Sequence, residues 1–352
     1  MMQCMTPAFR VGVTPDFYTD AKGRFETAVE HELQGIEWGP MPPQPGKRGT
    51  PDALDLFDAI LALGIHIDAQ SLRGVERLAL VSRWGVGYNT IDTAALTEAD
   101  VALAITPGSV RRPVAEAILT LIFGLTTNLL QQDRIVRSGK WRGDLPHLGR
   151  NIKGRVLGSV GCGNIALELF RMVQSLGFER LLAYDPYITP ERARSLRSDL
   201  GVELVSLDQL LRESDFVTIN ALLNSETEGL IGAAELRMMK PAAYLINTAR
   251  GPLVQEPALL QALREKWIAG AGLDVFEVEP LPLGSPFREL DNVILAPHGL
   301  AWTEEIVRDT AIEACANIRT IAKGEVPASI VNRDVLQRPG FLRKLERYKG
   351  EK

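Results

Sequence analysis

Short, mostly apolar runs alternate with helical patterns along most of this chain. Runs of four or five apolar residues without polar alternation are typical of parallel strands that are covered on both faces. We expect strands at residues 9–13, 59–63, 78–81, 156–160, 181–184, 216–219, 243–246, 271–274 and 293–296. Strands separated by helices predict an α/β protein with doubly wound parallel sheets.

Two long helices are expected between and after these strands. Residues 114–130 are apolar nearly all round, and Pro113 stands where a helix can begin, just after the boundary signal Thr106-Pro-Gly108. Such a helix must be buried on several sides, between domains or between subunits. A second helix is expected at 304–323, and residues 330–332 are expected to return to the first domain.

Two segments look irregular. The Pro- and Gly-rich stretch 39–51 is expected to be a surface loop, although a flap over a cleft is an alternative. The terminal residues 343–352 alternate in charge and are expected to form a solvated tail.

The segment around Gly161 has the strand, glycine turn and helix of a dinucleotide fingerprint. Gly161 allows the tight turn, Gly163 lets the backbone approach a pyrophosphate, and Ala166 lets the helix pack closely on its strand. The amides of the helix N-terminus then face the phosphates. Asp185 ends the next strand, where an acid accepts hydrogen bonds from the adenosine ribose. Glycine turns also occur without a ligand, but the flanking periodicity and this acid favour dinucleotide binding.

Composition narrows the class of protein. A chain of 352 residues predicts two domains, and a net charge of −5 without a basic cluster argues against nucleic acid. Cys4, Cys162 and Cys315 lie far apart and without metal-ligand spacing, which favours a reducing compartment and no metal. No signal peptide or membrane-spanning run is expected, so a soluble cytoplasmic protein without a membrane partner is the default expectation.

Three residues that follow successive expected strands suggest chemistry. His298 is the type of side chain that exchanges protons near neutral pH, and Glu279 could hydrogen-bond its imidazole. Arg250 carries the planar fork that suits a carbonyl and a carboxylate together. Each alone is most simply a structural or surface residue. Together, downstream of a fingerprint, they match what reduction of a 2-oxo acid by a nicotinamide requires.

The chain resembles the D-isomer-specific 2-hydroxyacid dehydrogenase family from about residue 78 to 332. Besides the fingerprint, the resemblance is carried by residues 83–89, 106–108, 114–116, 137–141, 247–251, 274–277, 279–280 and 297–298. It implies an NAD(H)-dependent enzyme that interconverts a 2-oxo acid and a D-2-hydroxy acid by hydride transfer.

The resemblance also implies roles for individual residues. His298 is the implied acid/base, Glu279 the carboxylate that keeps it protonated, and Arg250 the group that holds substrate carboxylate and carbonyl. The backbone amides of Val86 and Gly87 are implied to bind the substrate carboxylate. The implied cofactor-binding residues are Gly161, Cys162, Gly163, Asn164, Ile165, Asp185, Thr248 and Asp274, the last near the nicotinamide amide.

The implied architecture is a Rossmann-type NAD-binding domain, residues 107–300, inserted into a flavodoxin-like substrate domain. The substrate domain would comprise residues 1–106 and 301–352, facing the other domain across a cleft, and the chain would form a homodimer. Asp185 favours NAD over NADP because a carboxylate repels a 2′-phosphate, with Arg192 and Arg194 as possible counter-evidence.

The chain departs from the family pattern at Arg111 and Arg112, where relatives carry small polar residues. If they lie ahead of a helix N-terminus, they could bind a second anion on the substrate; surface arginines are the alternative. Two other functions stay open. A formate dehydrogenase-like enzyme is disfavoured because it carries glutamine where this chain has Glu279. The second alternative is an NAD-sensing, corepressor-like protein, which would not need the combination of Arg250, Glu279 and His298.

Overall fold

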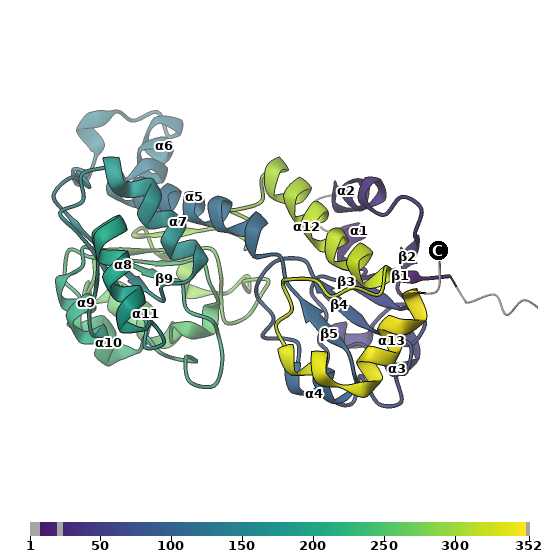
Figure 1. The fold of residues 1–352 in the computed structure, drawn as a ribbon. Helices are drawn as coiled ribbons and strands as arrows, with labels where there is room; N and C mark the ends of the chain where they lie inside the picture. Colours follow the sequence, from purple (N-terminus) through teal and green to yellow (C-terminus); the bar gives the residue numbers. More distant parts are fainter. Residues whose placement is uncertain (1–7, 20–23, 350–352) are drawn as a thin grey trace, which may run out of the picture. The chain divides into compact units, whose positions relative to one another are not determined.

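The computed structural model describes residues 8–19 and 24–349, which form two compact units (Figure 1). Unit 1 comprises the described parts of 1–110 and 303–352, and unit 2 comprises residues 111–302. Each unit has its own parallel sheet, so the expected α/β architecture is confirmed.

In the described part of unit 1, five parallel strands lie in the order β2-β1-β3-β4-β5, the flavodoxin arrangement. The strands are β1 (Arg10–Val13), β2 (Glu37–Pro40), β3 (Ala59–Ala62), β4 (Leu80–Arg83) and β5 (Ala102–Ala104). The helices are α1 (Asp16–Thr19), α2 (Arg24–Glu32), α3 (Pro51–Leu54), α4 (Thr93–Glu98), α12 (Glu304–Ala322) and α13 (Pro339–Lys349). Helices α2 and α12 cover one face of this sheet, and α3 and α4 cover the other (Figure 1).

Unit 2 contains, among its residues, seven parallel strands in the order β12-β11-β10-β9-β6-β7-β8. They are β6 (Val156–Val160), β7 (Arg180–Tyr184), β8 (Val202–Leu204), β9 (Phe216–Ile219), β10 (Tyr244–Asn247), β11 (Gly270–Leu273) and β12 (Val293–Leu295). The helices are α6 (Leu129–Arg137), α7 (Asn164–Met172), α8 (Pro190–Leu200), α9 (Leu207–Glu213), α10 (Ala233–Met238) and α11 (Glu256–Arg264). The chain order reverses between β6 and β9, and in such sheets ligands bind outside the carboxyl ends of the strands at this point.

Helix α5 (Pro107–Thr126) begins earlier than the sequence pattern predicts. Pro113 does not start it but lies inside it. The reason is a distant carboxylate: Glu313 of α12 accepts hydrogen bonds from the backbone N–H of Gly108 at 3.1 Å and of Ser109 at 3.0 Å. A carboxylate at a helix N-terminus satisfies donors that have no partner within the helix, so the first turn is helical here.

The apolar stretch after α5 is also divided differently from the prediction. Asn128 has a left-handed backbone with φ 55°, which separates α5 from α6. In the described part of the chain, no single helix is long and apolar enough to cross a membrane. Helices α5 and α6 together meet that length and composition, but they are bent by 58° at the break.

The return of the chain to unit 1 near residue 330 is confirmed. Ile330 forms an antiparallel bridge with Ala104, and the Val331 N–H donates to the Leu103 carbonyl at 2.8 Å. The Pro- and Gly-rich stretch 39–51 is anchored on the chain after β3, since the Gly49 N–H donates to the carbonyl of His66 at 2.9 Å.

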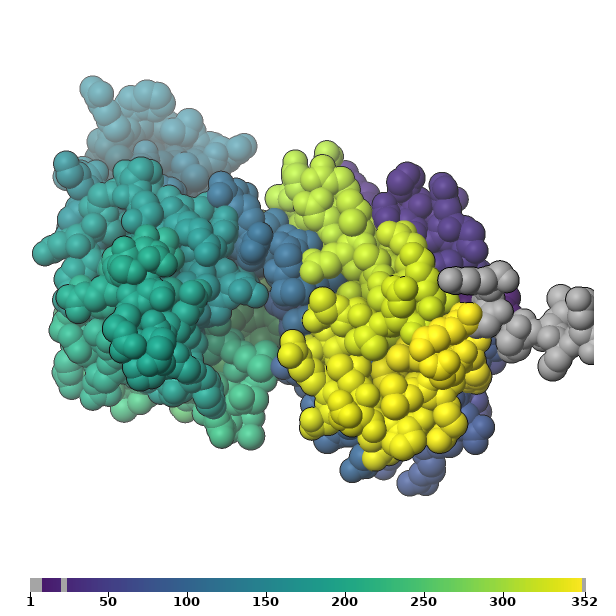
Figure 2. Space-filling model, viewed as in Figure 1, coloured from purple at the N-terminus to yellow at the C-terminus, as the bar shows by residue number. Residues whose placement is uncertain are grey.

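The expectation of a solvated C-terminal tail is wrong for residues 343–349, which belong to α13. Figure 2 shows these residues, in yellow, covering part of the surface of unit 1. The buried side chains of α13 are Phe341, Lys344, Leu345 and Tyr348. Their spacing of three and four residues is an amphipathic pattern, which the alternating charges obscured.

Lys344 is buried, yet each of its ammonium donors has a partner. Its Nζ donates to the carbonyl oxygens of Leu78 at 2.7 Å, Asp100 at 3.1 Å and Ala99 at 3.2 Å. Burial lowers the pKa of Lys344 to about 8, because desolvation disfavours the charged form. The buried face of α13 therefore contributes a hydrogen-bonded lysine side chain to the interior of unit 1.

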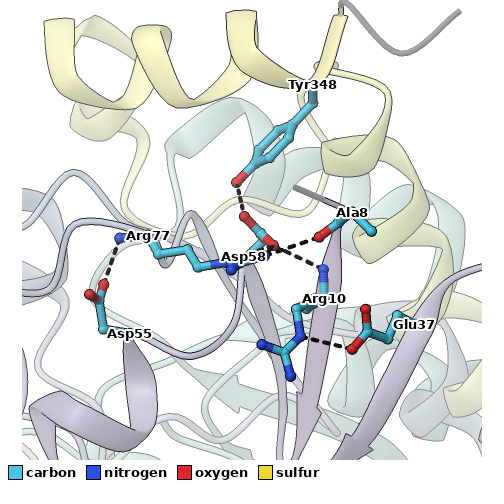
Figure 3. Close-up of polar contacts among 7 residues, drawn as sticks. All are labelled: Ala8, Arg10, Glu37, Asp55, Asp58, Arg77 and Tyr348. Atoms are coloured by element: carbon cyan, nitrogen blue, oxygen red, sulfur yellow. Dashed lines mark hydrogen bonds and ion pairs between the residues drawn. The ribbon is translucent and has the colours of Figure 1, made fainter. Parts of the chain in front are cut away.

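Asp58 connects α13 to the sheet (Figure 3). Its Oδ1 accepts a hydrogen bond from the Tyr348 hydroxyl at 3.0 Å, and its Oδ2 accepts from Arg77 Nη2 at 2.6 Å and from the Arg10 N–H at 2.9 Å. Burial, and then the charge of Asp58, raise the pKa of the Tyr348 phenol. One buried carboxylate thus joins β1, the chain ahead of β4 and the last helix.

Replacing Asp58 should destabilise the protein more than replacing its phenol partner. Asp58→Ala leaves the Arg77 guanidinium and the Tyr348 hydroxyl without this partner, so we expect a loss of about 3–5 kcal/mol in the free energy of unfolding. Tyr348→Phe removes one hydrogen bond and should cost about 2 kcal/mol. Urea denaturation followed by tryptophan fluorescence measures both.

Glu346→Ala is the control, because Glu346 pairs with Lys349 on the exposed side of α13. We expect it to change the unfolding free energy by less than about 0.5 kcal/mol. Equal losses for Asp58→Ala and Glu346→Ala would contradict the buried role of Asp58.

Candidate active site

The glycine turn after β6 has the geometry that a phosphate-binding turn requires. Gly161 has φ 94°, and a Cβ built on it would lie 2.7 Å from the backbone of Asn220 after β9, so no side chain fits. Gly163 precedes α7 without any side-chain cap, and a Cβ there would meet no atom within 4 Å. The first N–H groups of α7 therefore adjoin open space at the switch point of the sheet, where an anion is favoured.

Asp185 follows β7 and is held at this turn by backbone donors. Its Oδ2 accepts a hydrogen bond from the Cys162 N–H at 2.9 Å, and its Oδ1 accepts from the Tyr187 N–H at 3.0 Å. Each carboxylate oxygen has a second lone pair. The carboxylate is therefore fixed in position and still able to accept hydrogen bonds from ribose hydroxyls.

The hydroxyl oxygen of Thr248 is in a position where a bound ligand could supply a hydrogen-bond partner. This Oγ1 is buried and has no hydrogen-bond partner among the described residues, and a buried hydroxyl without a partner is costly. Together with the open turn at Gly163 and the fixed Asp185, this atom fits a dinucleotide that extends from β7 to β10.

The turn after β10 packs closely against the turn after β11. A Cβ on Gly251 would overlap the backbone carbonyl carbon of Phe276, so only glycine permits this approach. Buried Asn247 holds the turn from within, since its Nδ2 donates to the Arg250 carbonyl at 2.9 Å and its Oδ1 accepts from the Ala249 N–H at 3.1 Å. Neither role of Asn247 and Gly251 is visible in the sequence motif 247–251 itself.

Glu279 and His298 form a hydrogen-bonded pair. His298 Nδ1 lies 2.7 Å from Glu279 Oε2, and the other oxygen of Glu279 accepts from the Phe276 N–H at 3.0 Å. An ionised carboxylate only accepts hydrogen bonds, so Nδ1 carries the hydrogen. The second ring nitrogen, Nε2, is then the atom that can exchange a proton with a substrate.

The ionisation of Glu279 depends on its neighbours. Burial alone would raise its pKa, but the hydrogen bond with His298, the charge of His298, the Phe276 N–H and the charge of Arg250 outweigh burial and lower the pKa below its ordinary value. Glu279 is therefore a carboxylate throughout the neutral range. Burial in turn lowers the pKa of the Arg250 guanidinium, and the charge of Glu279 opposes that shift.

Asp274 holds the turn that carries His298. Its Oδ1 accepts hydrogen bonds from the N–H groups of Gly299 at 3.1 Å and Leu300 at 3.2 Å. His298 has a left-handed backbone with φ 52°, which is rare for a residue other than glycine and costs about 1 kcal/mol or more. Strain of this kind persists where surrounding bonds enforce it, and here Asp274 supplies them.

Val86 and Gly87 lie in unit 1, in the turn after β4. Arg83 stabilises this turn, because its Nε donates to the Gly87 carbonyl at 2.9 Å and its Nη1 donates to the Ala62 carbonyl at 3.1 Å. The Gly85 N–H donates to Thr106 Oγ1 at 2.9 Å. The turn is thus anchored by side chains on both sides.

The idea that Arg111 and Arg112 lie ahead of a helix N-terminus is wrong. Both are inside α5, which begins at Pro107. Arg112 Nε donates to Glu116 at 2.6 Å, and its Nη1 lies 3.4 Å from Glu168 of α7. Arg112 is therefore already paired with carboxylates on the surface of unit 2.

These features define the class of protein: a nucleotide-binding α/β oxidoreductase with an arginine, a glutamate and a histidine at the ends of β10, β11 and β12. A family model for the D-isomer specific 2-hydroxyacid dehydrogenase NAD binding domain matches residues 119–299. The chain is 36% identical over 338 residues to a glyoxylate reductase of Korarchaeum cryptofilum, covering 94% of this chain and 99% of that protein. It is 39% identical over 299 residues to a glyoxylate reductase of Thermofilum pendens, covering 83% and 85%.

Comparison with solved structures indicates the same family. A glyoxylate reductase from Paecilomyes thermophila is 27% identical with a TM-score of 0.78, covering 92% of this chain and 98% of that one. The D-mandelate dehydrogenase of Rhodotorula graminis is 26% identical with a TM-score of 0.78, at the same coverage. The chain belongs to the D-isomer-specific 2-hydroxyacid dehydrogenase family. It is an NAD-dependent oxidoreductase with 2-hydroxyacid dehydrogenase activity, and its cofactor is NAD(H).

Cys162 should resist alkylation in the native protein. Burial, and then the charge of Asp185, raise the pKa of its thiol to about 11, and burial raises that of Cys315 to about 12. Because the thiolate is the nucleophile, both should react with iodoacetamide at pH 7.5 at least about 100-fold more slowly than a free thiol. Peptide mass spectrometry after timed alkylation measures the rates, and urea-unfolded protein is the control. Labelling of Cys162 at the unfolded rate would contradict its burial; Cys4 lies outside the described residues.

Proposed function

We propose that this chain interconverts a 2-oxo acid and a D-2-hydroxy acid, with His298 as the acid/base. The observation that carries the proposal is the 2.7 Å contact between His298 Nδ1 and Glu279 Oε2. The carboxylate accepts the hydrogen of Nδ1 and fixes the ring, so Nε2 is the atom that would give a proton to the substrate oxygen. In the oxidation direction the same nitrogen takes the proton from the hydroxyl.

Arg250 and the turn at Val86 and Gly87 would position the substrate. A guanidinium presents several donors in one plane, which suits a carbonyl oxygen and a carboxylate oxygen at once. The backbone N–H groups of Val86 and Gly87 would also bind the carboxylate, from a turn that Arg83 anchors. Binding of this kind serves ground state and transition state alike.

The cofactor would be held by the turn 161–165, Asp185, Thr248 and Asp274. When bound, its nicotinamide supplies the hydride for reduction and accepts it in oxidation. The amides of α7 would bind the phosphates, Asp185 the adenosine ribose, and the buried hydroxyl of Thr248 would gain a partner. We propose residues 107–300 as the NAD-binding domain and residues 1–106 with 301–352 as the substrate domain.

The relatives favour a small substrate. Those of Korarchaeum cryptofilum and Thermofilum pendens carry the name glyoxylate reductase. We therefore propose glyoxylate as the first substrate to test. A panel of glyoxylate, hydroxypyruvate, phosphohydroxypyruvate and branched 2-oxo acids, assayed by NADH oxidation, tests the function directly, and absence of turnover with the whole panel would refute it.

Two substitutions test the proposed acid/base pair. His298→Ala should lower kcat for reduction by about 10²- to 10⁴-fold, the usual contribution of general acid–base catalysis. Glu279→Gln removes the negative charge that favours the imidazolium, so the fall in kcat/KM for reduction at high pH should begin at lower pH than in the wild type. The oxidation profile should move in the same direction, since the neutral base forms more readily. Full pH–rate profiles with one good 2-oxo acid measure these shifts.

Glu277→Gln is the matched control, because Glu277 lies on the same turn but accepts a hydrogen bond from the Glu256 N–H, at 3.0 Å. Its profile should coincide with that of the wild type. A Glu279→Gln profile that also coincides would mean that the carboxylate does not tune His298.

We also propose that the chain forms a homodimer through an apolar surface on α5, α6 and the segment after α6. Large apolar side chains are exposed there: Phe123, Leu129, Leu130, Val136, Trp141 and Leu148. Leu129 is 58% exposed and Trp141 67% exposed, and exposed apolar side chains on neighbouring segments of the chain suit an association surface.

Charges placed on this surface should separate the subunits. We expect the double variant Leu129→Glu and Leu130→Glu to be monomeric in light scattering after size exclusion, whereas the wild type is a dimer, because burying two carboxylates without partners is costly. Leu283→Glu is the control, since Leu283 is an exposed leucine elsewhere in unit 2. A wild-type monomer, or a double variant that stays dimeric, would refute the proposed interface.

A further inference from the structure

A tyrosine links the turns that follow β7 and β9. The Tyr187 hydroxyl donates a hydrogen bond to Glu226 Oε2 at 2.6 Å, although the two residues are 39 positions apart. The Tyr187 side chain is otherwise 74% exposed. An exposed aromatic side chain is thus held in one place by a charged partner.

The same tyrosine is fixed at its backbone. Its N–H donates to Asp185 Oδ1 at 3.0 Å, and Asp185 Oδ2 in turn accepts from the Cys162 N–H at 2.9 Å. Glu226 is therefore connected, through one residue, to the carboxylate proposed for the adenosine ribose.

The turn that carries Glu226 is itself well ordered by local bonds. Asn224 Oδ1 accepts from the N–H of Glu226 at 2.9 Å and of Thr227 at 3.0 Å. The Asn224 N–H donates to Thr227 Oγ1 at 2.9 Å. Glu226 thus extends from a fixed turn toward the end of β7.

Two negative charges are therefore gathered at this end of the sheet. The Tyr187 hydroxyl contacts Glu226 and the Tyr187 N–H contacts Asp185, so one residue joins both carboxylates. The hydrogen bond to Glu226 and its charge raise the pKa of the phenol. In the described part of the chain, no ion pair joins a cation of α8 to Asp185 or Glu226. Arg194 is paired with Glu191 at 3.1 Å, and Arg192 lies close enough for its charge to act on the thiol of Cys162.

We propose that Tyr187 and Glu226 form an acidic clasp that, with Asp185, selects NAD(H) over NADP(H). The clasp rests on the proposed role of Asp185 and adds a second determinant to it. A 2′-phosphate brings about −1.5 to −2 charges to the ribose. It would meet one carboxylate at Asp185 and, one tyrosine side chain away, a second at Glu226.

Charge screening sets the conditions for observing this effect. Both Tyr187 and Glu226 are exposed, and the Debye length is about 10 Å at 0.1 M salt and about 3 Å at 1 M. Repulsion by Glu226 should be measurable at low ionic strength and largely lost in concentrated salt. Steric exclusion of the phosphate would be insensitive to salt.

The experiment measures binding of two fragments to the protein without its cofactor. Dissociation constants for ADP-ribose and for 2′-phospho-ADP-ribose are determined by calorimetry at about 0.02 M and about 1 M salt. We expect Glu226→Gln to tighten binding of the phosphorylated fragment about fivefold at low salt, to leave ADP-ribose within twofold, and to lose most of the gain at high salt. Tyr187→Phe keeps the charge of Glu226 but releases the Glu226 side chain from the tyrosine hydroxyl. Binding of the phosphorylated fragment should therefore tighten only about twofold at low salt.

Glu228→Gln is the matched control, because it removes the same charge from the same turn without touching Tyr187. Its two dissociation constants should equal those of the wild type. The clasp is refuted if Glu226→Gln and Glu228→Gln behave alike while Asp185→Ala changes the ratio of the two constants. If Tyr187→Phe does not tighten binding of the phosphorylated fragment, the tyrosine plays no part in the selection of NAD(H). If Asp185→Ala also leaves the ratio unchanged, the proposed ribose site itself is wrong.

Discussion

The close approach of two backbone segments underlies the candidate active site. Gly251, after β10, lies against the carbonyl of Phe276, after β11, at a separation that no side chain permits. This packing places the turn of Arg250 beside the turn of Glu279, whose carboxylate then contacts His298. The geometry of the three side chains thus derives from backbone contacts and from buried Asn247 and Asp274. A site built in this way is fixed before any ligand arrives.

Much of the fold could be predicted from the sequence because central parallel strands are buried on both faces and read as apolar runs. The edge strands β2, β5 and β8 were missed. Glu37-Trp-Gly-Pro40 and Val202-Glu-Leu204 mix polar and apolar residues, and β5 (Ala102–Ala104) is only three residues long. Helix α5 begins at Pro107 because Glu313 accepts hydrogen bonds from its first N–H groups. Lys344 can be buried because three backbone carbonyls accept hydrogen bonds from its ammonium group. Such long-range partners leave no local pattern.

The same distinction holds in the site. Asp185, Asp274, Glu279 and His298 could be proposed from the sequence because each closely follows a strand and matches a family motif. The groups to which these side chains hydrogen-bond within the protein could not be predicted from the sequence. Asp185 also holds the N–H of Cys162, and Asp274 holds the turn after His298. Contacts of this kind, like that between Tyr187 and Glu226, join residues tens of positions apart without any periodicity between them.

The division of unit 1 between the two ends of the chain has a consequence for its biosynthesis. Its main core packs Val11 and Phe25 with Ile318 of α12 and Phe341 of α13. During translation the N-terminal half of this core therefore waits, incomplete, while all of residues 111–302 emerge from the ribosome. The nucleotide-binding unit can fold while it is being made, whereas the other unit closes only after α12 and α13 have been synthesised.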